Sequence, residues 1–161
     1  MNYCMECGTK LEPKFLENEG DIPYCANCQA YRFPVFNTAV SMIVLNPMQD
    51  KVLLIKQYQR DEFILVAGFV NKGENREHAV AREIGEELGL QLRSLHYNKS
   101  EYFDKSNTLI LNFTCVAETA SLAGVTAEVD YAEWFSFEEA RKMIKKESLA
   151  QLFLENYLCQ L

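Results

Sequence analysis

An acidic segment with helical periodicity offers the first candidates for chemistry. Within residues 75–89, apolar side chains recur at every fourth position: Val80, Ile84 and Leu88. At ~100° of rotation per residue, Glu83, Glu86 and Glu87 fall on the arc beside that stripe. Arg82 lies at the edge of the same arc. Clustered carboxylates repel one another unless a cation lies among them, and hard oxygen ligands suit Mg²⁺ or Mn²⁺. The segment indicates a divalent-metal site, with a solvated acidic helix face as the alternative.

Glycines around this segment favour the metal site. Gly85 inside a helix costs about 1 kcal/mol relative to alanine. Gly68 and Gly73 bracket a loop that leads to the helix N-terminus, where backbone N–H groups favour anions. We therefore interpret the loop and helix together as a functional unit.

A second candidate site is formed by cysteines near the N-terminus. Four of the six cysteines form two Cys-x2-Cys pairs: Cys4, Cys7, Cys25 and Cys28. Four thiolates close a tetrahedral shell with no open position, which is typical of structural Zn²⁺, whereas redox thiols normally use one pair. Metal binding then supplies the folding free energy that so small a core cannot. Cys115 and Cys159 are expected to be buried free thiols.

The glycines and acids together resemble a known family. The stretch matches the Nudix box at every specified position: Gly68-x5-Glu74-x7-Arg82-Glu83-Ile84-x-Glu86-Glu87-x-Gly89-Leu90. The resemblance implies that Glu83 and Glu87 bind metal directly and that Glu86 is a ligand or a base. It also implies that Arg82 orients the glutamates and that Glu74 supports the loop through hydrogen bonds.

Two further metal-site residues are carried over from the family by position. The carbonyl of Ala67 is a ligand in some members, and Glu128 stands where many members keep another acidic ligand or base. An exposed loop acid is the alternative for Glu128. The implied chemistry is metal-assisted hydrolysis of a diphosphate, with a carboxylate taking the proton of the attacking water.

The pairing of a zinc ribbon with a Nudix domain is similar to the NADH pyrophosphatase branch of the family. That branch carries a Ser-Gln-Pro-Trp-Pro-Phe-Pro-x-Ser signature, which aligns here with residues 100–108. Only Ser100 is identical; Phe103 stands in place of tryptophan, and the three prolines are absent. The resemblance implies these substrate contacts: Glu101, Tyr102, Phe103, Thr108 and Ala150. The expected substrate is a nucleoside diphosphate derivative such as an NAD(H)-like dinucleotide or ADP-ribose. A sugar nucleotide, FAD, a nucleoside triphosphate and a capped RNA end remain open.

The remaining chain supplies the elements that must position these residues. We expect a hairpin of strands 39–45 and 51–57, an apolar run 63–70, the helix 75–89, strands 92–103, 108–117 and 133–135, and helices 136–147 and 148–161. Ser136 to Glu139 form a capping box, and Gly89 ends the acidic helix. The fold class is therefore α+β: a Nudix fold, with a mixed β-sheet between helices in residues 34–161, preceded by a small zinc ribbon in residues 1–33.

Composition bounds the remaining function classes. Of 161 residues, 48% are hydrophobic and 24% charged, so a buried core is expected. The net charge of −7 argues against non-specific nucleic-acid binding, although metal ions can still bridge acids to phosphates. There is no apolar run of transmembrane length and no signal-peptide pattern, so we expect a cytoplasmic protein without membrane contact. Family members are often homodimers, but the sequence indicates no interface.

A zinc-ribbon regulator is the main alternative function. Ribbons often bind nucleic acid, and such a protein could carry a Nudix domain that only binds a ligand. The residues around the cysteine pairs are net acidic, however, and show no basic stripe interleaved with aromatics. The sequence thus favours the hydrolase.

Overall fold

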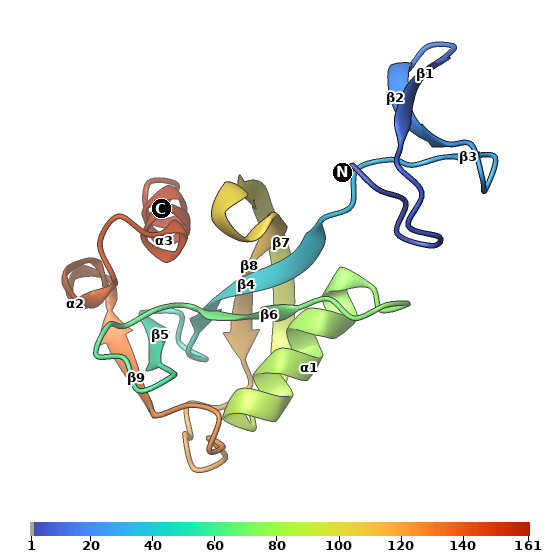
Figure 1. The fold of residues 1–161 in the computed structure, drawn as a ribbon. Helices are drawn as coiled ribbons and strands as arrows, with labels where there is room; N and C mark the ends of the chain where they lie inside the picture. Colours follow the sequence, from blue (N-terminus) through green and yellow to red (C-terminus); the bar gives the residue numbers. More distant parts are fainter. Residues whose placement is uncertain (1) are drawn as a thin grey trace. The chain divides into compact units, whose positions relative to one another are not determined.

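The computed structural model describes residues 2–161, which form two compact units, Met1–Phe36 and Asn37–Leu161 (Figure 1). The smaller unit is a three-stranded antiparallel sheet of β1 (Glu12–Leu16), β2 (Gly20–Cys25) and β3 (Ala30–Tyr31). Its buried core consists of Cys4, Leu11 and Cys25. Because three residues cannot bury enough apolar area to fix a fold, this unit depends on its cysteines.

The larger unit is built on a six-stranded mixed sheet. Its strands are β4 (Asn37–Leu45), β5 (Lys51–Lys56), β6 (Val66–Phe69), β7 (Leu92–Phe103), β8 (Thr108–Ala117) and β9 (Tyr131–Ser136). The order is β7-β8-β4-β5-β9, and β6 also pairs with β4. Strands β4 and β8 are parallel, whereas the other pairs are antiparallel. The predicted hairpin of the first two strands is confirmed.

Alternating side chains divide the core of this unit into two layers. On β4, Val40 and Met42 belong to one cluster, and Ile43 and Leu45 belong to the other. Helix α1 (Arg76–Leu88) covers the first cluster, while α2 (Phe137–Met143) and α3 (Leu149–Leu158) cover the second (Figure 1). Successive side chains of β4 point to opposite faces of the sheet, and both faces of β4 are apolar because both are covered.

Helix α1 begins and ends at the residues that the sequence indicates. The side chain of Asn75 accepts a hydrogen bond from the backbone N–H of His78 at 3.0 Å. Gly89 ends the helix in the left-handed conformation, at φ 66°. A Cβ at this position would lie 2.7 Å from the carbonyl oxygen of Gly124, so glycine is required there for space as well as for conformation. The stripe of Val80, Ile84 and Leu88 is fully buried, as predicted.

Several boundaries differ from the predictions because of contacts distant in sequence. The capping box at Ser136 is present, but α2 ends at Met143 instead of residue 147. Ile144 is buried and extended, and it bridges to Phe63. The last helix ends at Leu158. The expectation that Cys159 is buried is wrong, since it lies exposed just after that helix, whereas Cys115 is buried.

The apolar run 63–70 forms a strand only over Val66–Phe69, and the short strand at 133–135 extends to Tyr131–Ser136 by pairing with β5. Within residues 2–161, no helix combines the length and the apolarity needed to cross a bilayer.

Candidate active site

Arg82 organises the acids of the loop and of helix α1. Its guanidinium binds both carboxylate oxygens of Glu74, at 2.8 and 3.0 Å. It also donates to Glu83 Oε1 at 2.8 Å and to Glu86 Oε2 at 3.0 Å. A further N–H bonds to the carbonyl of Phe69 at 2.9 Å, which ties the helix to β6. One planar cation therefore places three acids in fixed positions.

Glu74 closes the loop before the helix. Besides binding Arg82, it accepts the backbone N–H of Asn71 at 3.0 Å. The bonds from Arg82 and Asn71 lower the pKa of Glu74 to about 2. Glu74 therefore stays ionised, which suits a part in holding the loop and not one in proton transfer.

Glu83 lies against the backbone of β6. Its carboxylate is placed so close to Gly68 that an added Cβ would lie 1.9 Å from its Cδ. Gly68 directly follows Ala67, so the Glu83 carboxylate lies against the neighbour of Ala67 on β6. The structure thus brings Ala67 and Glu83 together, and the glycine makes room for the acid.

Glu87 is the buried acid of the site. It is 6% exposed, and its Oε1 accepts a hydrogen bond from Gln57 Nε2 at 2.9 Å. Its Oε2 is buried without a hydrogen-bond partner among residues 2–161. Burial raises the pKa of Glu87 to about 7, the bond from Gln57 opposes this, and the charges of Glu83, Glu128 and Glu86 raise it further. Four acids therefore act on one another electrostatically here.

The raised pKa of Glu87 predicts how stability depends on pH. The folded protein binds the proton of Glu87 more tightly, with a pKa of about 7, than the unfolded chain does, with the ordinary pKa of 4.5. This stabilisation is complete below pH 4.5 and is lost as the pH rises through 7. Without added divalent ions, the free energy of unfolding of wild type should fall by roughly 3 kcal/mol relative to Glu87→Gln between pH 4.5 and 8. Urea unfolding of both proteins across this range checks it, and parallel pH profiles would contradict it.

Glu128 lies on the other side of Glu87. Both line a cavity of about 380 Å³ together with Gln57 and Asp130. Glu128 is exposed in the loop before β9, and Glu86 is also exposed, at 58% of its side chain. Exposed carboxylates next to a buried one can approach a ligand from solvent.

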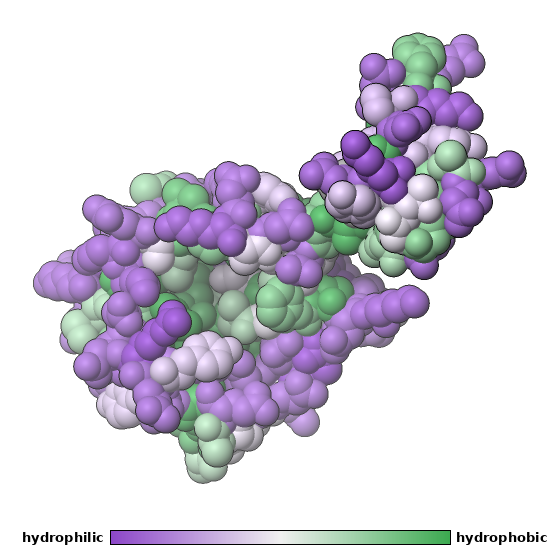
Figure 2. Space-filling view, in the orientation of Figure 1, coloured by the Kyte–Doolittle hydropathy of each residue, from purple (hydrophilic) through white to green (hydrophobic). Residues whose placement is uncertain are grey.

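A larger cleft of about 630 Å³ begins at Ala67. Apolar residues of β4, of the segment before β6 and of α3 line much of it, and Phe103 of β7 and Ala150 of α3 are among them. On the face shown in Figure 2, the larger unit has apolar surface recessed between hydrophilic rims. Phe103 and Ala150 are thus brought to the same cleft as Ala67.

Three of the predicted substrate contacts do not line this cleft. Glu101 pairs with Lys99 at 2.6 Å, and the hydroxyl of Tyr102 bonds to Asn107. Thr108 is buried, and its hydroxyl bonds to Ser106. Strand alternation explains this for Tyr102, because the residue before Phe103 on β7 points to the opposite face.

The four cysteines of the smaller unit converge on one point. Their Sγ atoms all lie within 4.8 Å of one another, with Cys4 and Cys28 3.9 Å apart and Cys7 and Cys25 3.5 Å apart. Tetrahedral Zn²⁺ with bonds of about 2.3 Å separates its sulfurs by about 3.8 Å, so the cluster fits this ion. Arg32 donates to Cys4 Sγ at 3.2 Å and lowers the pKa of that thiol.

Removal of the cluster should unfold the smaller unit alone. In Cys25→Ser we expect loss of bound zinc and rapid proteolysis within Met1–Phe36, with Asn37–Leu161 resistant, because metal binding supplies the folding energy of the ribbon. Chromogenic zinc release and mass spectrometry of a limited digest measure both effects. Cys159→Ser, which changes an exposed cysteine outside the cluster, is the control. Full zinc content in Cys25→Ser would contradict a zinc site.

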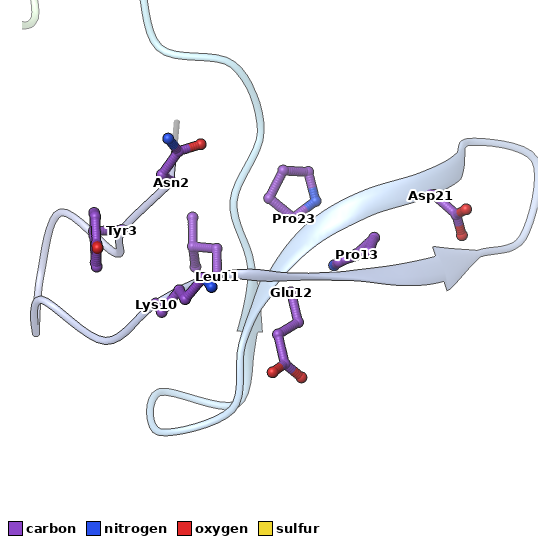
Figure 3. Close-up of a pocket in the computed structure, with 8 residues that line it drawn as sticks. All are labelled: Asn2, Tyr3, Lys10, Leu11, Glu12, Pro13, Asp21 and Pro23. Carbon is purple, nitrogen blue, oxygen red and sulfur yellow. The ribbon is translucent and has the colours of Figure 1, made fainter.

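The smaller unit also has an open hollow of about 340 Å³ (Figure 3). Tyr3, Lys10 and Leu11 line it from the N-terminal segment, and Glu12 and Pro23 line it from β1 and β2. It contains none of the four cysteines and none of the acids of α1, so it belongs to neither candidate metal centre.

The comparisons with known proteins agree with this geometry. The NUDIX domain model matches residues 35–156. The chain belongs to the Nudix hydrolase family. The NAD-capped RNA hydrolase NudC of Pseudomonas aeruginosa (strain LESB58) is 28% identical over 98% of this chain and 56% of its own length. The protein of that name from Deinococcus radiodurans (strain R1) is 29% identical over 99% of this chain and 57% of its own. The chain thus spans little more than half the length of these curated relatives.

Solved structures show the same fold. A NUDIX hydrolase from Nitrosomonas europaea superposes with a TM-score of 0.65 at 19% identity, over 98% of this chain and 88% of that one. The predicted α+β Nudix fold, with a mixed sheet between helices after a small four-cysteine sheet, is confirmed.

Sequence reasoning missed Gln57 and the carbonyl of Phe69. Gln57 is 5% exposed although it is polar, and it directly follows the apolar run Val52–Ile55 and Lys56. A glutamine at the end of a buried strand was the available signal, but its partner lies 30 positions later in the chain. Phe69 accepts the bond from Arg82 through its backbone carbonyl, a group that every residue has, so residue type does not indicate this contact.

Proposed function

We propose that this Nudix protein is a metal-dependent pyrophosphohydrolase that cleaves the diphosphate of a nucleoside diphosphate derivative, either an NAD(H)-like dinucleotide or ADP-ribose. One observation carries the proposal: Arg82 holds Glu83 and Glu86 on α1, while Glu83 lies against Gly68, the neighbour of Ala67 in the wall of the cleft. Acids at one end of a nucleoside-sized apolar cleft suit a substrate with a phosphate end and a base end.

The residues present fit Mg²⁺ or Mn²⁺. Among residues 2–161, the buried Oε2 of Glu87 has no partner, and such an atom is costly unless a cation or donor reaches it. All the candidate ligands are hard oxygens, the type that these ions prefer: the carboxylates of Glu83, Glu86, Glu87 and Glu128 and the carbonyl of Ala67. When bound, the ions would neutralise the diphosphate and make a water more acidic.

The protein side of the reaction follows from the acids. A carboxylate takes a proton from water, whose oxygen attacks one phosphorus while the bond from that phosphorus to the bridging oxygen breaks. The products are two monophosphates. Glu86, whose side chain is 58% exposed, is the candidate base, because Glu87 is assigned to the metal ions. Arg82 keeps the acids in place throughout.

The far end of the substrate would occupy the apolar cleft. Phe103 offers a ring for a base, and Ala150 leaves space at the start of α3. The names of the NudC relatives add support for a substrate containing an NAD unit. The proposal retains Phe103 and Ala150 from the five predicted contacts.

A substrate panel tests the proposal. NADH, NAD⁺, ADP-ribose, FAD, sugar nucleotides, nucleoside triphosphates and an NAD-capped RNA are incubated with Mg²⁺ or Mn²⁺, and products are separated by ion-exchange chromatography. We expect two monophosphate ends from a dinucleotide or ADP-ribose, and no turnover by Glu83→Gln. Glu77→Gln is the matched control, since Glu77 lies on the same helix but pairs with Arg76. Tight ligand binding without turnover by the zinc-loaded protein would favour the regulator instead.

A further inference from the structure

Gln57 lies beside the acids of the candidate site and hydrogen-bonds to one of them, Glu87. It follows β5, is 5% exposed, and donates from Nε2 to Glu87 Oε1 at 2.9 Å. Both partners are buried, and the two oxygens of Glu87 are therefore unequal: one is held by an amide, and the other has no partner among the described residues. Burying the amide of Gln57 costs free energy. An apolar side chain at this position could instead have continued the core of Val52–Ile55.

The backbone after Gln57 is held in an unusual conformation. Tyr58 and Gln59 are successive non-glycine residues with positive φ, at 60° and 56°. Such strain persists only where the surroundings impose it. Here the backbone N–H of Gln59 donates to Asp130 Oδ2 at 2.7 Å, and the N–H of Asp130 donates to the carbonyl of Lys56 at 2.9 Å. These bonds fix the direction in which the chain leaves Gln57.

The same bonds connect Gln57 with the segment that carries Glu128. Asp130 lies two positions after Glu128, and both line the cavity beside Gln57 and Glu87. Arg82 binds Glu74, Glu83 and Glu86. The turn after β5 is connected instead with the other two acids, Glu87 and Glu128.

From this geometry we propose that Gln57 is a positioning residue, which holds Glu87 Oε1 so that Oε2 is the oxygen presented to the divalent ion. The inference rests on the proposed function. The terminal torsion of a glutamate is broad, so without this bond the plane of the carboxylate can rotate away from the ion. Residues that orient a metal ligand in this way typically contribute 10–100-fold to metal affinity or activity.

The decisive test is a double-mutant cycle on Mn²⁺ binding to the substrate-free protein. Gln57→Met keeps the length of the side chain and removes the donor. We expect it to weaken Mn²⁺ binding about 10-fold, as measured by electron paramagnetic resonance. It should also lower kcat with little change in KM. In the Glu87→Gln background the same substitution should have no further effect, because Gln57 acts only through Glu87. Gln57→Asn, which keeps the amide but shortens its reach, should reproduce the loss.

Controls separate this role from a general effect on the fold. Gln91→Leu changes an exposed glutamine outside the site and should leave Mn²⁺ affinity unchanged. Equal Mn²⁺ affinity in wild type, Gln57→Met and Gln57→Asn would overturn the positioning role, as would an equal loss in both backgrounds of the cycle. A cycle that behaves as expected in a protein that cleaves none of the panel overturns the proposed function alone. Substrate turnover by a protein in which the Gln57 substitutions do not change Mn²⁺ affinity overturns the positioning role alone.

Discussion

Glu87→Gln should lower kcat by roughly 10²–10⁴-fold while the protein stays folded. Glutamine matches glutamate in size, and its amide oxygen can still accept the hydrogen bond from Gln57 Nε2. It carries no charge for a divalent ion and cannot take a proton at neutral pH. The effect is measured as kcat on the substrate identified by the panel, with circular dichroism to confirm the fold.

The control for Glu87 lies on the same helix. Glu77→Gln changes the charge of α1 equally but removes only an ion pair with Arg76. Its kcat should remain within about twofold of wild type, since surface ion pairs contribute little. Unchanged turnover in Glu87→Gln would exclude Glu87 both as a ligand and as the base, and would leave Glu83 and Glu86 as the acids of the reaction.

Gly68→Ala should lower activity strongly without destabilising the protein. The added Cβ would lie 1.9 Å from Glu83 Cδ, so the carboxylate must move. Since this is the flexible end of a side chain and the φ of Gly68 is not positive, β6 can keep its backbone. A displacement of about 1 Å at a reacting group can cost on the order of 10²-fold in rate. We expect kcat to fall by at least that factor, with a Tm within a few degrees of wild type.

Gly85→Ala is the matched substitution for Gly68→Ala. Gly85 also lies between the acids in sequence, but a Cβ there meets no atom within 4 Å. It should raise the free energy of unfolding by about 1 kcal/mol through helix propensity and leave kcat unchanged. The space beside Gly85 offers no packing reason for a glycine. If both alanine variants kept full activity, the close approach of Glu83 to Gly68 would have no catalytic importance.

Local features of the chain were predictable because neighbours in sequence create them. Helix α1 follows from apolar residues four positions apart and a stop at Gly89, both within one segment. The thiol cluster follows similarly from two Cys-x2-Cys turns. These patterns sufficed to predict the acidic helix and the four-cysteine cluster, whereas the Nudix fold was implied by the resemblance of the box to the family.

The boundaries that differ depend on contacts between distant segments. Helix propensity allows α2 to continue past Met143, but burial of Ile144 against Phe63 makes extended backbone more favourable. Cys159 is exposed because α3 is a turn shorter than its apolar composition suggested, which leaves the end of the chain beyond the core.

The sequence by itself determined which residues are candidates for the chemistry: the acids of the box, Arg82 and the cysteines. Only the tertiary structure decided how they differ from one another. Burial and Gln57 make Glu87 unlike Glu86, although the two are adjacent in sequence. The cleft likewise joins Ala67, Phe103 and Ala150 from separate elements. The physical reason is that pKa, oxygen orientation and cavity shape depend on desolvation and contacts across the sheet, which no local spacing encodes.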